Sequence, residues 1–260
     1  MCYDDNARPP ITPNDGAAHG EDIVLTAEDG NRFAAYAAHP AQPGGAQILI
    51  FPDVRGLHQF YKELALRFAE AGISALAIDY FGRTADLTAR DDSFEYMPHV
   101  MQMKMETFRA DVAAALAHLH TGAGASRATF TVGFCMGGSL SFRTAASGFD
   151  LTGAIGFYAG LSRVMPPGAT GTILDIAGSI TCPVLGLFGG ADQAIPVSDV
   201  EALDQKLDTA GVEHEIVIYP GAPHSFFDRR ATDYAEASAD AWQRILTFIE
   251  THTAWRSERP

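Results

Sequence analysis

The feature that most constrains the fold is a glycine-flanked cysteine between an apolar run and a helix-like segment. Residues 128–134 read as a buried strand, Gly133, Cys135 and Gly137 form a Gly-x-Cys-x-Gly pattern, and residues 139–146 read as a helix. Such a strand-turn-helix junction, a nucleophile elbow, exposes the central side chain, and its glycines let strand and helix approach without a Cβ clash. The alternative is that Cys135 is a small core residue, since free cysteines are among the most buried side chains.

Two further chemistry-bearing residues follow strand-like runs downstream. Asp192 comes after the apolar run 184–190, and His224 comes after the run 215–220. Alone, such an aspartate is commonly a turn or helix cap, and such a histidine is commonly solvated. Chains with a nucleophile elbow order their triad as nucleophile, acid and base, and Cys135, Asp192 and His224 follow that order. Together they predict one site at the carboxyl edge of a sheet.

The chain resembles the dienelactone hydrolase family, a branch of the α/β-hydrolases whose nucleophile is a cysteine. Three motifs carry the resemblance: Gly-Phe-Cys-Met-Gly-Gly at 133–138, Gly-Gly-Ala-Asp-Gln-Ala-Ile-Pro at 189–196 and Gly-Ala-Pro-His-Ser-Phe at 221–226. The likeness spans roughly residues 22–249. It implies an α/β-hydrolase fold and a cysteine-dependent hydrolase that cleaves an ester or lactone of a small, anionic carboxylic acid through a thioester.

Alternating strand-like and helix-like runs predict the same architecture. After a polar arm at 1–20, two runs between residues 23 and 37 predict strands joined in a hairpin. Later strands alternate with helical patterns, which predicts a mostly parallel central sheet with helices on both faces and an antiparallel N-terminal edge. We expect one domain over 21–254, a tail at 255–260, and at 84–105 either a lid or a short helix packed on the domain.

Each member of the triad has a chemical task. His224 would take the thiol proton of Cys135, and Asp192 would hold the imidazole in the required tautomer. The oxyanion needs two donors, for which we expect the backbone amides of Met136, directly after the cysteine, and Val54, in the loop after residues 47–51.

The loop that holds Val54 departs from the family. There the family has a glutamate that binds the resting thiol, and Asp53 matches its position with a side chain one methylene shorter. Asp53 is therefore either the thiol partner or a residue that turns the chain after Pro52. Arg55 is either a site residue or a solvated surface charge.

The resemblance also implies two arginines that hold a substrate carboxylate. Arg83 matches the first, and a planar guanidinium suits bidentate binding. Asp228 stands where the second is expected, and Arg229 follows one position late. Either Arg229 replaces the second arginine or the preferred substrate differs. Tyr158 matches a family tyrosine near the nucleophile, although strand-end tyrosines are commonly half-buried packing residues.

Composition limits the remaining classes of function. The chain has 260 residues, of which 47% are hydrophobic, and a formal net charge of −14, which disfavours nucleic-acid binding. No run approaches the ~18 apolar residues of a membrane helix. The first ten residues carry acids where a secretory signal has basic residues, and the three cysteines form no C-x-x-C pair, so we expect a cytoplasmic protein. We expect the protein to be a monomer or a homodimer.

No metal-ligand spacing, P-loop or dinucleotide fingerprint is present in the sequence, so we expect neither a metal nor a cofactor. The expected partner is a small-molecule ester or lactone. Two alternatives stay open: a general carboxylesterase or thioesterase, and a non-catalytic protein on the same fold in which Cys135 senses oxidation.

Overall fold

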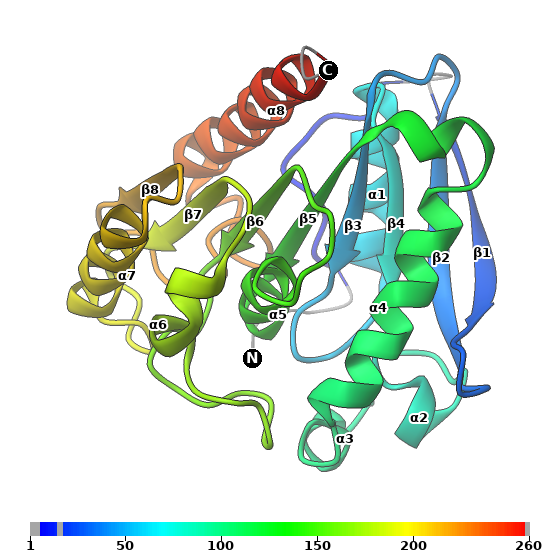
Figure 1. Cartoon of the computed structure of the whole chain (residues 1–260), viewed down its shortest axis with the longest axis horizontal. Helices are drawn as coiled ribbons and strands as arrows, with labels where there is room; N and C mark the ends of the chain where they lie inside the picture. Colours follow the sequence, from blue (N-terminus) through cyan, green and yellow to red (C-terminus); the bar gives the residue numbers. More distant parts are fainter. Residues whose placement is uncertain (1–5, 15–17, 258–260) are drawn as a thin grey trace.

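An eight-stranded sheet forms the centre of the molecule, with its strands in the order β1-β2-β4-β3-β5-β6-β7-β8 (Figure 1). The computed structural model describes residues 6–14 and 18–257. From β4 to β8 all neighbouring strands run parallel, whereas β1 pairs with β2, and β2 with β4, in the antiparallel sense. The predicted α/β-hydrolase fold with its antiparallel N-terminal edge is confirmed.

The elements alternate along the chain. The strands are β1 (Ala18–Thr26), β2 (Arg32–Pro40), β3 (Ala46–Phe51), β4 (Ser74–Ile78), β5 (Ala128–Phe134), β6 (Gly153–Phe157), β7 (Val184–Gly189) and β8 (His214–Tyr219). The α-helices are α1 (Gln59–Glu70), α2 (Gly82–Ala85), α3 (Tyr96–Val100), α4 (Met105–Leu119), α5 (Met136–Ala145), α6 (Ile173–Ile176), α7 (Val197–Ala210) and α8 (Ala235–Ser257), and two 3-10 turns are η1 (Gly122–Ser126) and η2 (Ala177–Ser179).

Both ends of the chain differ from the sequence-based boundaries. β1 starts at Ala18, inside the expected arm at 1–20, because its nine residues pair in register with β2 from Ala18↔Pro40 to Thr26↔Arg32. Residues 1–5 and 15–17 of that arm lie outside the described part of the chain. Helix α8 runs through Ser257, so the first half of the expected tail at 255–260 is helical, and residues 258–260 are not described.

Helices cover both faces of the sheet (Figure 1). On one face α1 and α8 pack against each other, with the ring centroids of Phe68 and Trp242 4.9 Å apart. Helices α4 and α5 lie on the other face. Strands β3 to β7 are buried along their whole length, as continuous apolar runs in a parallel sheet require.

The parallel strands bring distant residues to one edge of the sheet. β3, β5, β6, β7 and β8 point the same way, so their carboxyl ends lie side by side. The loops that follow these five strands carry, in turn, Val54, Cys135, Tyr158, Asp192 and His224. In open α/β sheets this is the edge at which ligands bind.

Candidate active site

Cys135 occupies a strained turn between β5 and α5. Its backbone has φ 57° and ψ −115°, a conformation unfavourable for a residue with a Cβ. The turn is crowded: a Cβ on Gly133 would lie 1.9 Å from the Gly137 carbonyl oxygen, and one on Gly137 would lie 2.1 Å from that of Pro52. Glycine is therefore required at both positions. The amide of Cys135 donates to the Phe157 carbonyl at 3.1 Å, which fixes the turn against β6.

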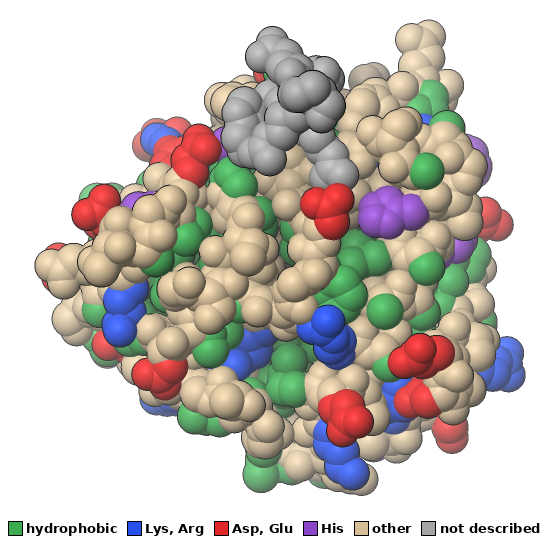
Figure 2. Space-filling view, in the orientation of Figure 1, with side chains coloured by type: hydrophobic (Ala, Val, Ile, Leu, Met, Phe, Trp, Pro, Cys, Tyr) green, Lys and Arg blue, Asp and Glu red, His purple; other side chains and the backbone are tan. Residues whose placement is uncertain are grey.

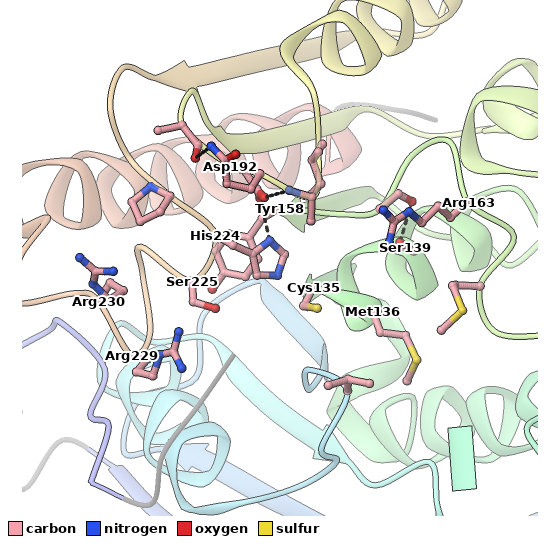
Figure 3. Close-up of a pocket in the computed structure, with 18 of the residues that line it drawn as sticks. Cys135, Met136, Ser139, Tyr158, Arg163, Asp192, His224, Ser225, Arg229 and Arg230 are labelled. Carbon is pink, nitrogen blue, oxygen red and sulfur yellow. Dashed lines mark hydrogen bonds and ion pairs between the residues drawn. The ribbon is translucent and has the colours of Figure 1, made fainter. Parts of the chain in front are cut away.

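Asp192 and His224 form a hydrogen-bonded pair beside this turn. Asp192 Oδ2 lies 2.7 Å from His224 Nδ1, and the amide of Ala194 donates to Asp192 Oδ1 at 2.8 Å. The Asp192 side chain is 1% exposed and that of His224 is 25% exposed. Because the carboxylate accepts from Nδ1, the neutral imidazole carries its other lone pair on Nε2. In Figure 3 the imidazole lies between Asp192 and Cys135.

One cavity of about 540 Å³ contains all three members of the expected triad in its lining. Val54 and Met136, the residues whose amides are the expected donors, line it as well. Met136 is the first residue of α5, where backbone amides have no acceptor within the helix and point along the positive end of its dipole. The sequence-predicted nucleophile, acid, base and both donor loops therefore meet at one place.

Asp53 lies behind Val54 and is fully buried. Its Oδ1 accepts from the Arg55 amide at 2.9 Å and lies 3.4 Å from His58 Nε2, while its own amide donates to the Tyr61 hydroxyl at 2.9 Å. Burial and the charge of Arg55 lower the pKa of His58 to about 3, so this imidazole is neutral near pH 7. Asp53 thus helps to hold the loop in shape.

Arg55 is not a solvated surface charge. Its side chain is 3% exposed, and its guanidinium binds Asp92 Oδ1 at 2.8 Å and the carbonyl of Asp91 at 3.3 Å. It ties the loop after β3 to the segment before α3.

Arg83 lies outside the cavity, and its placement does not support the expected contact with substrate. Its guanidinium binds Asp111 through Nε at 3.1 Å and Nη2 at 2.7 Å, and Asp29 through Nη1 at 2.6 Å. Arg83 Nη2 also donates to the carbonyl of Thr107 at 3.1 Å. Arg83, which matches the family motif, therefore forms ion pairs with two carboxylates, and neither of these lies within the motif.

Tyr158 and Asp228 form a buried pair on the other side of the histidine. The ring centroid of Tyr158 lies 4.8 Å from that of His224, and its hydroxyl donates to Asp228 Oδ2 at 2.8 Å. Both side chains are almost fully buried. The carboxylate at the position where the family has an arginine therefore serves the tyrosine, and Arg229, the next residue, lines the cavity.

Only part of the segment 84–105, which we expected to be a lid or a packed helix, borders the cavity. Tyr96 and Met97, at the start of α3, line the cavity. Phe94 instead stacks on His99, with ring centroids 5.0 Å apart, and the Arg90 guanidinium lies 4.6 Å from its centroid. Phe94 thus packs on the domain, while the first turn of α3 borders the cavity.

Among the cavity residues that sequence reasoning missed, two carry polar groups that could bind a ligand, Ser225 and Arg163. Ser225 is 1% exposed, has φ 61°, and its Oγ has no hydrogen-bond partner in the part of the chain that the structure describes. The sequence feature that could have indicated Ser225 is its position directly after His224. Arg163 lies in the loop between β6 and α6, where no sequence pattern marked it.

The described residues contain no group of three or more His, Cys, Asp or Glu side chains that could hold a metal ion. No described helix combines the length and the apolar character needed to cross a membrane.

Comparison with known proteins identifies the family of this chain. The model of the dienelactone hydrolase family matches residues 33–253. The chain belongs to the dienelactone hydrolase family. Membership makes it a hydrolase that acts on carboxylic ester bonds.

Relatives in this family match nearly the whole chain. A protein of Salmonella typhimurium named as a carboxymethylenebutenolidase is 32% identical over 247 residues, which cover 92% of this chain and 89% of that protein. One of Escherichia coli O157:H7 with the same name is 29% identical over 254 residues, covering 95% and 92%. The crystal structure of a dienelactone hydrolase from Klebsiella pneumoniae superposes with a TM-score of 0.78 at 27% identity, covering 90% of this chain and 99% of that one.

Proposed function

We propose that this member of the family cleaves its ester or lactone through a thioester on Cys135, with His224 as general base and acid and Asp192 as its orienting partner. The observation that supports this most directly is the strained turn that presents Cys135 to the same cavity as the hydrogen-bonded His224–Asp192 pair. A redox-sensing role would need neither the pair nor the cavity.

The reaction would proceed in two halves. His224 Nε2 takes the thiol proton, and the sulfur of Cys135 attacks the substrate carbonyl carbon to give a tetrahedral oxyanion. The amides of Met136 and Val54 donate to that oxygen. The carbon–oxygen bond then breaks, the leaving alkoxide takes the proton from His224, and a thioester remains.

Hydrolysis of the thioester reverses these roles. His224 removes a proton from water, the hydroxide attacks the thioester carbonyl, and the same two amides hold the second oxyanion. The carbon–sulfur bond breaks, the carboxylic acid leaves, and the sulfur of Cys135 recovers a proton from His224. Asp192 stabilises the imidazolium that forms in both halves.

Asp53 is proposed as the partner of the resting thiol. Its burial and its position next to Val54, in the loop that packs against the elbow glycine Gly137, support a role beside the sulfur.

We also propose that the substrate is anionic. Ser225 presents a buried hydroxyl without a partner among the described residues, and Arg229 presents a guanidinium to the same cavity, so the two are suited to bind a carboxylate.

The decisive test measures hydrolysis of a chromogenic ester and of cis- and trans-dienelactone. Replacing Cys135 or His224 by Ala should lower kcat on the order of 10³-fold or more, because triads act as a unit. Cys182→Ala is the matched control, since Cys182 is buried away from the cavity and its variant should keep most of the activity. Mass spectrometry of acid-quenched enzyme should find the acyl group on the Cys135 peptide. A loss of less than about tenfold in both triad variants would place the chemistry elsewhere.

A further inference from the structure

The cavity is cationic although the chain is strongly acidic. The protein has 18 Lys and Arg residues against 32 Asp and Glu. Three arginines, Arg163, Arg229 and Arg230, line the cavity, and its single acidic lining residue, Asp192, is bound to His224. Charge of one sign in a cleft attracts ligands of the opposite sign. The three arginines therefore give the cavity a positive charge that the chain as a whole lacks.

Two of these three guanidinium groups are uncommitted. Arg230 Nε binds Asp233 at 2.8 Å, and its guanidinium lies 5.6 Å from the ring centroid of Tyr234. In the described part of the chain, the guanidinium groups of Arg163 and Arg229 have no hydrogen-bond or ion-pair partner. Among arginines with described side chains, Arg32 is the one other residue in this condition, and it lies on β2 outside the cavity. Free guanidinium groups are thus concentrated at the site.

The two free arginines come from different loops and flank the nucleophile. Arg229 follows β8, and Arg163 lies between β6 and α6. In Figure 3 they lie on opposite sides of Cys135, with Arg229 beside Ser225 and Arg163 beside Ser139. A single carboxylate beside Ser225 would be held by Arg229 and not by Arg163.

The cavity is of the size of an ordinary small-molecule site. Its volume of about 540 Å³ lies inside the range of about 300–1,000 Å³ found for such sites. Apolar side chains, among them Met136, Met165 and Ile195, line the space as well. A carbon skeleton of drug-like size is suited to pockets of this volume.

On the face of the molecule shown in Figure 2, Lys and Arg side chains are interspersed with Asp and Glu side chains. We propose that Arg163 forms a second anion subsite, so that the preferred substrate carries an anionic group on each side of its scissile carbonyl. One group binds at Ser225 and Arg229, the other at Arg163, and the ester carbonyl lies between them at Cys135. This proposal rests on the proposed function, since it takes Cys135 as the point of attack.

Four matched nitrophenyl esters test the proposal: a neutral acetate, a hemiglutarate with a carboxylate on the acyl side, an acetate of a carboxylated nitrophenol, and a hemiglutarate of that phenol, which carries both. We expect wild type to show the highest kcat/KM for the doubly charged ester. Arg163→Gln should raise KM for one of the two singly charged esters by about 10–100-fold relative to the neutral ester, and Arg229→Gln should do so for the other. Either variant should impair the doubly charged ester.

Arg32→Gln serves as the control for loss of an exposed, unpaired guanidinium, and Arg163→Lys should restore only part of the selectivity, because an ammonium lacks the planar fork. If both cavity variants affect the same singly charged ester, a single clamp exists and the second subsite is overturned, while the proposed function stands. The second subsite is overturned as well if the doubly charged ester is no better than the singly charged ones. Failure of the proposed function has a different signature, namely hydrolysis of the neutral ester that survives Cys135→Ala.

Discussion

At the scale of single residues, several side chains at the cavity form hydrogen bonds with one another. Asp228 accepts the hydroxyl of Tyr158, which leaves the neighbouring Arg229 to present its charge to the cavity. Asp192 is likewise committed to His224. The guanidinium groups of Arg163 and Arg229 are exposed and have no partner among the described residues, whereas the Ser225 hydroxyl is buried without one. A buried polar group without a partner is costly, so the Ser225 hydroxyl favours a ligand beside it.

The two described cysteines should differ sharply in reactivity. Cys135 lines the cavity at the positive end of α5, whereas burial raises the pKa of Cys182 to about 12. At pH 8 a thiol of that pKa is ionised to only about one part in 10⁴, and the thiolate is the form that reacts. Mild iodoacetamide followed by peptide mass spectrometry should therefore label Cys135 first. A bound carboxylate-containing inhibitor should slow that labelling, and urea-unfolded protein should label both cysteines equally. Earlier labelling of Cys182 would contradict this assignment.

At the scale of elements, sequence patterns identified the site-bearing strands because each is an apolar run followed by glycine or a turn. The first and last residues of β1 were harder to predict from the sequence. Its exposed and half-buried residues alternate, and its length is decided by pairing with β2. Arg83 shows the limit of a linear motif. Its partners lie 54 and 28 residues away in sequence, at Asp29 and Asp111, and nothing near position 83 announces them. Contacts of that kind require the fold.

Arg83 joins three elements, and its loss should affect stability more than substrate selectivity. It connects the β1–β2 hairpin at Asp29, α2, and α4 at Asp111, whose side chain is 2% exposed. Arg83→Gln leaves that buried carboxylate without its charge partner, which should lower the free energy of unfolding by about 3 kcal/mol. Asp29→Asn, at a side chain that is 40% exposed, is the control and should cost much less, because solvent screens an exposed ion pair. Urea denaturation measures both. A selective rise in KM for anionic esters, without destabilisation, would restore Arg83 to the substrate site.

At the scale of the whole molecule, the sequence predicted the sheet and its antiparallel edge, and it predicted that Cys135, Asp192 and His224 line one cavity. It did not predict which arginines reach the cavity. Arg163 lies on a loop between β6 and α6 whose path depends on tertiary packing, and its neighbours in sequence carry no periodic signal. Position in a motif fixes backbone placement more reliably than side-chain partners, because partners come from any part of the chain.

Stability should fall on the alkaline side. Burial raises the pKa of Cys182 from 9.0 to about 12, and it also raises those of Tyr61 and Tyr219 above their usual value. A group with a raised pKa in the folded state stabilises the fold below its unfolded pKa, and this contribution is lost as pH rises through the interval between the two. Cys182 alone should therefore remove about 1 kcal/mol between pH 8 and pH 10.

Chemical denaturation at those two pH values measures this loss. Cys182→Ala should show a smaller fall than wild type over the same interval, whatever its stability at pH 8. Equal falls in the two proteins would show that Cys182 is not shielded from ionisation.

The order of the strands also governs when the enzyme becomes competent during folding. Cys135, the proposed nucleophile, follows the central strand β5, whereas Asp192 and His224, its proposed partners, follow β7 and the edge strand β8. Non-local pairings of this kind form slowly, and an edge strand is held on one side only. The return of turnover during refolding therefore reports docking of β8, the last strand in the sequence. The same edge allows the reverse event, in which β8 detaches briefly and withdraws the histidine while the centre of the sheet stays intact.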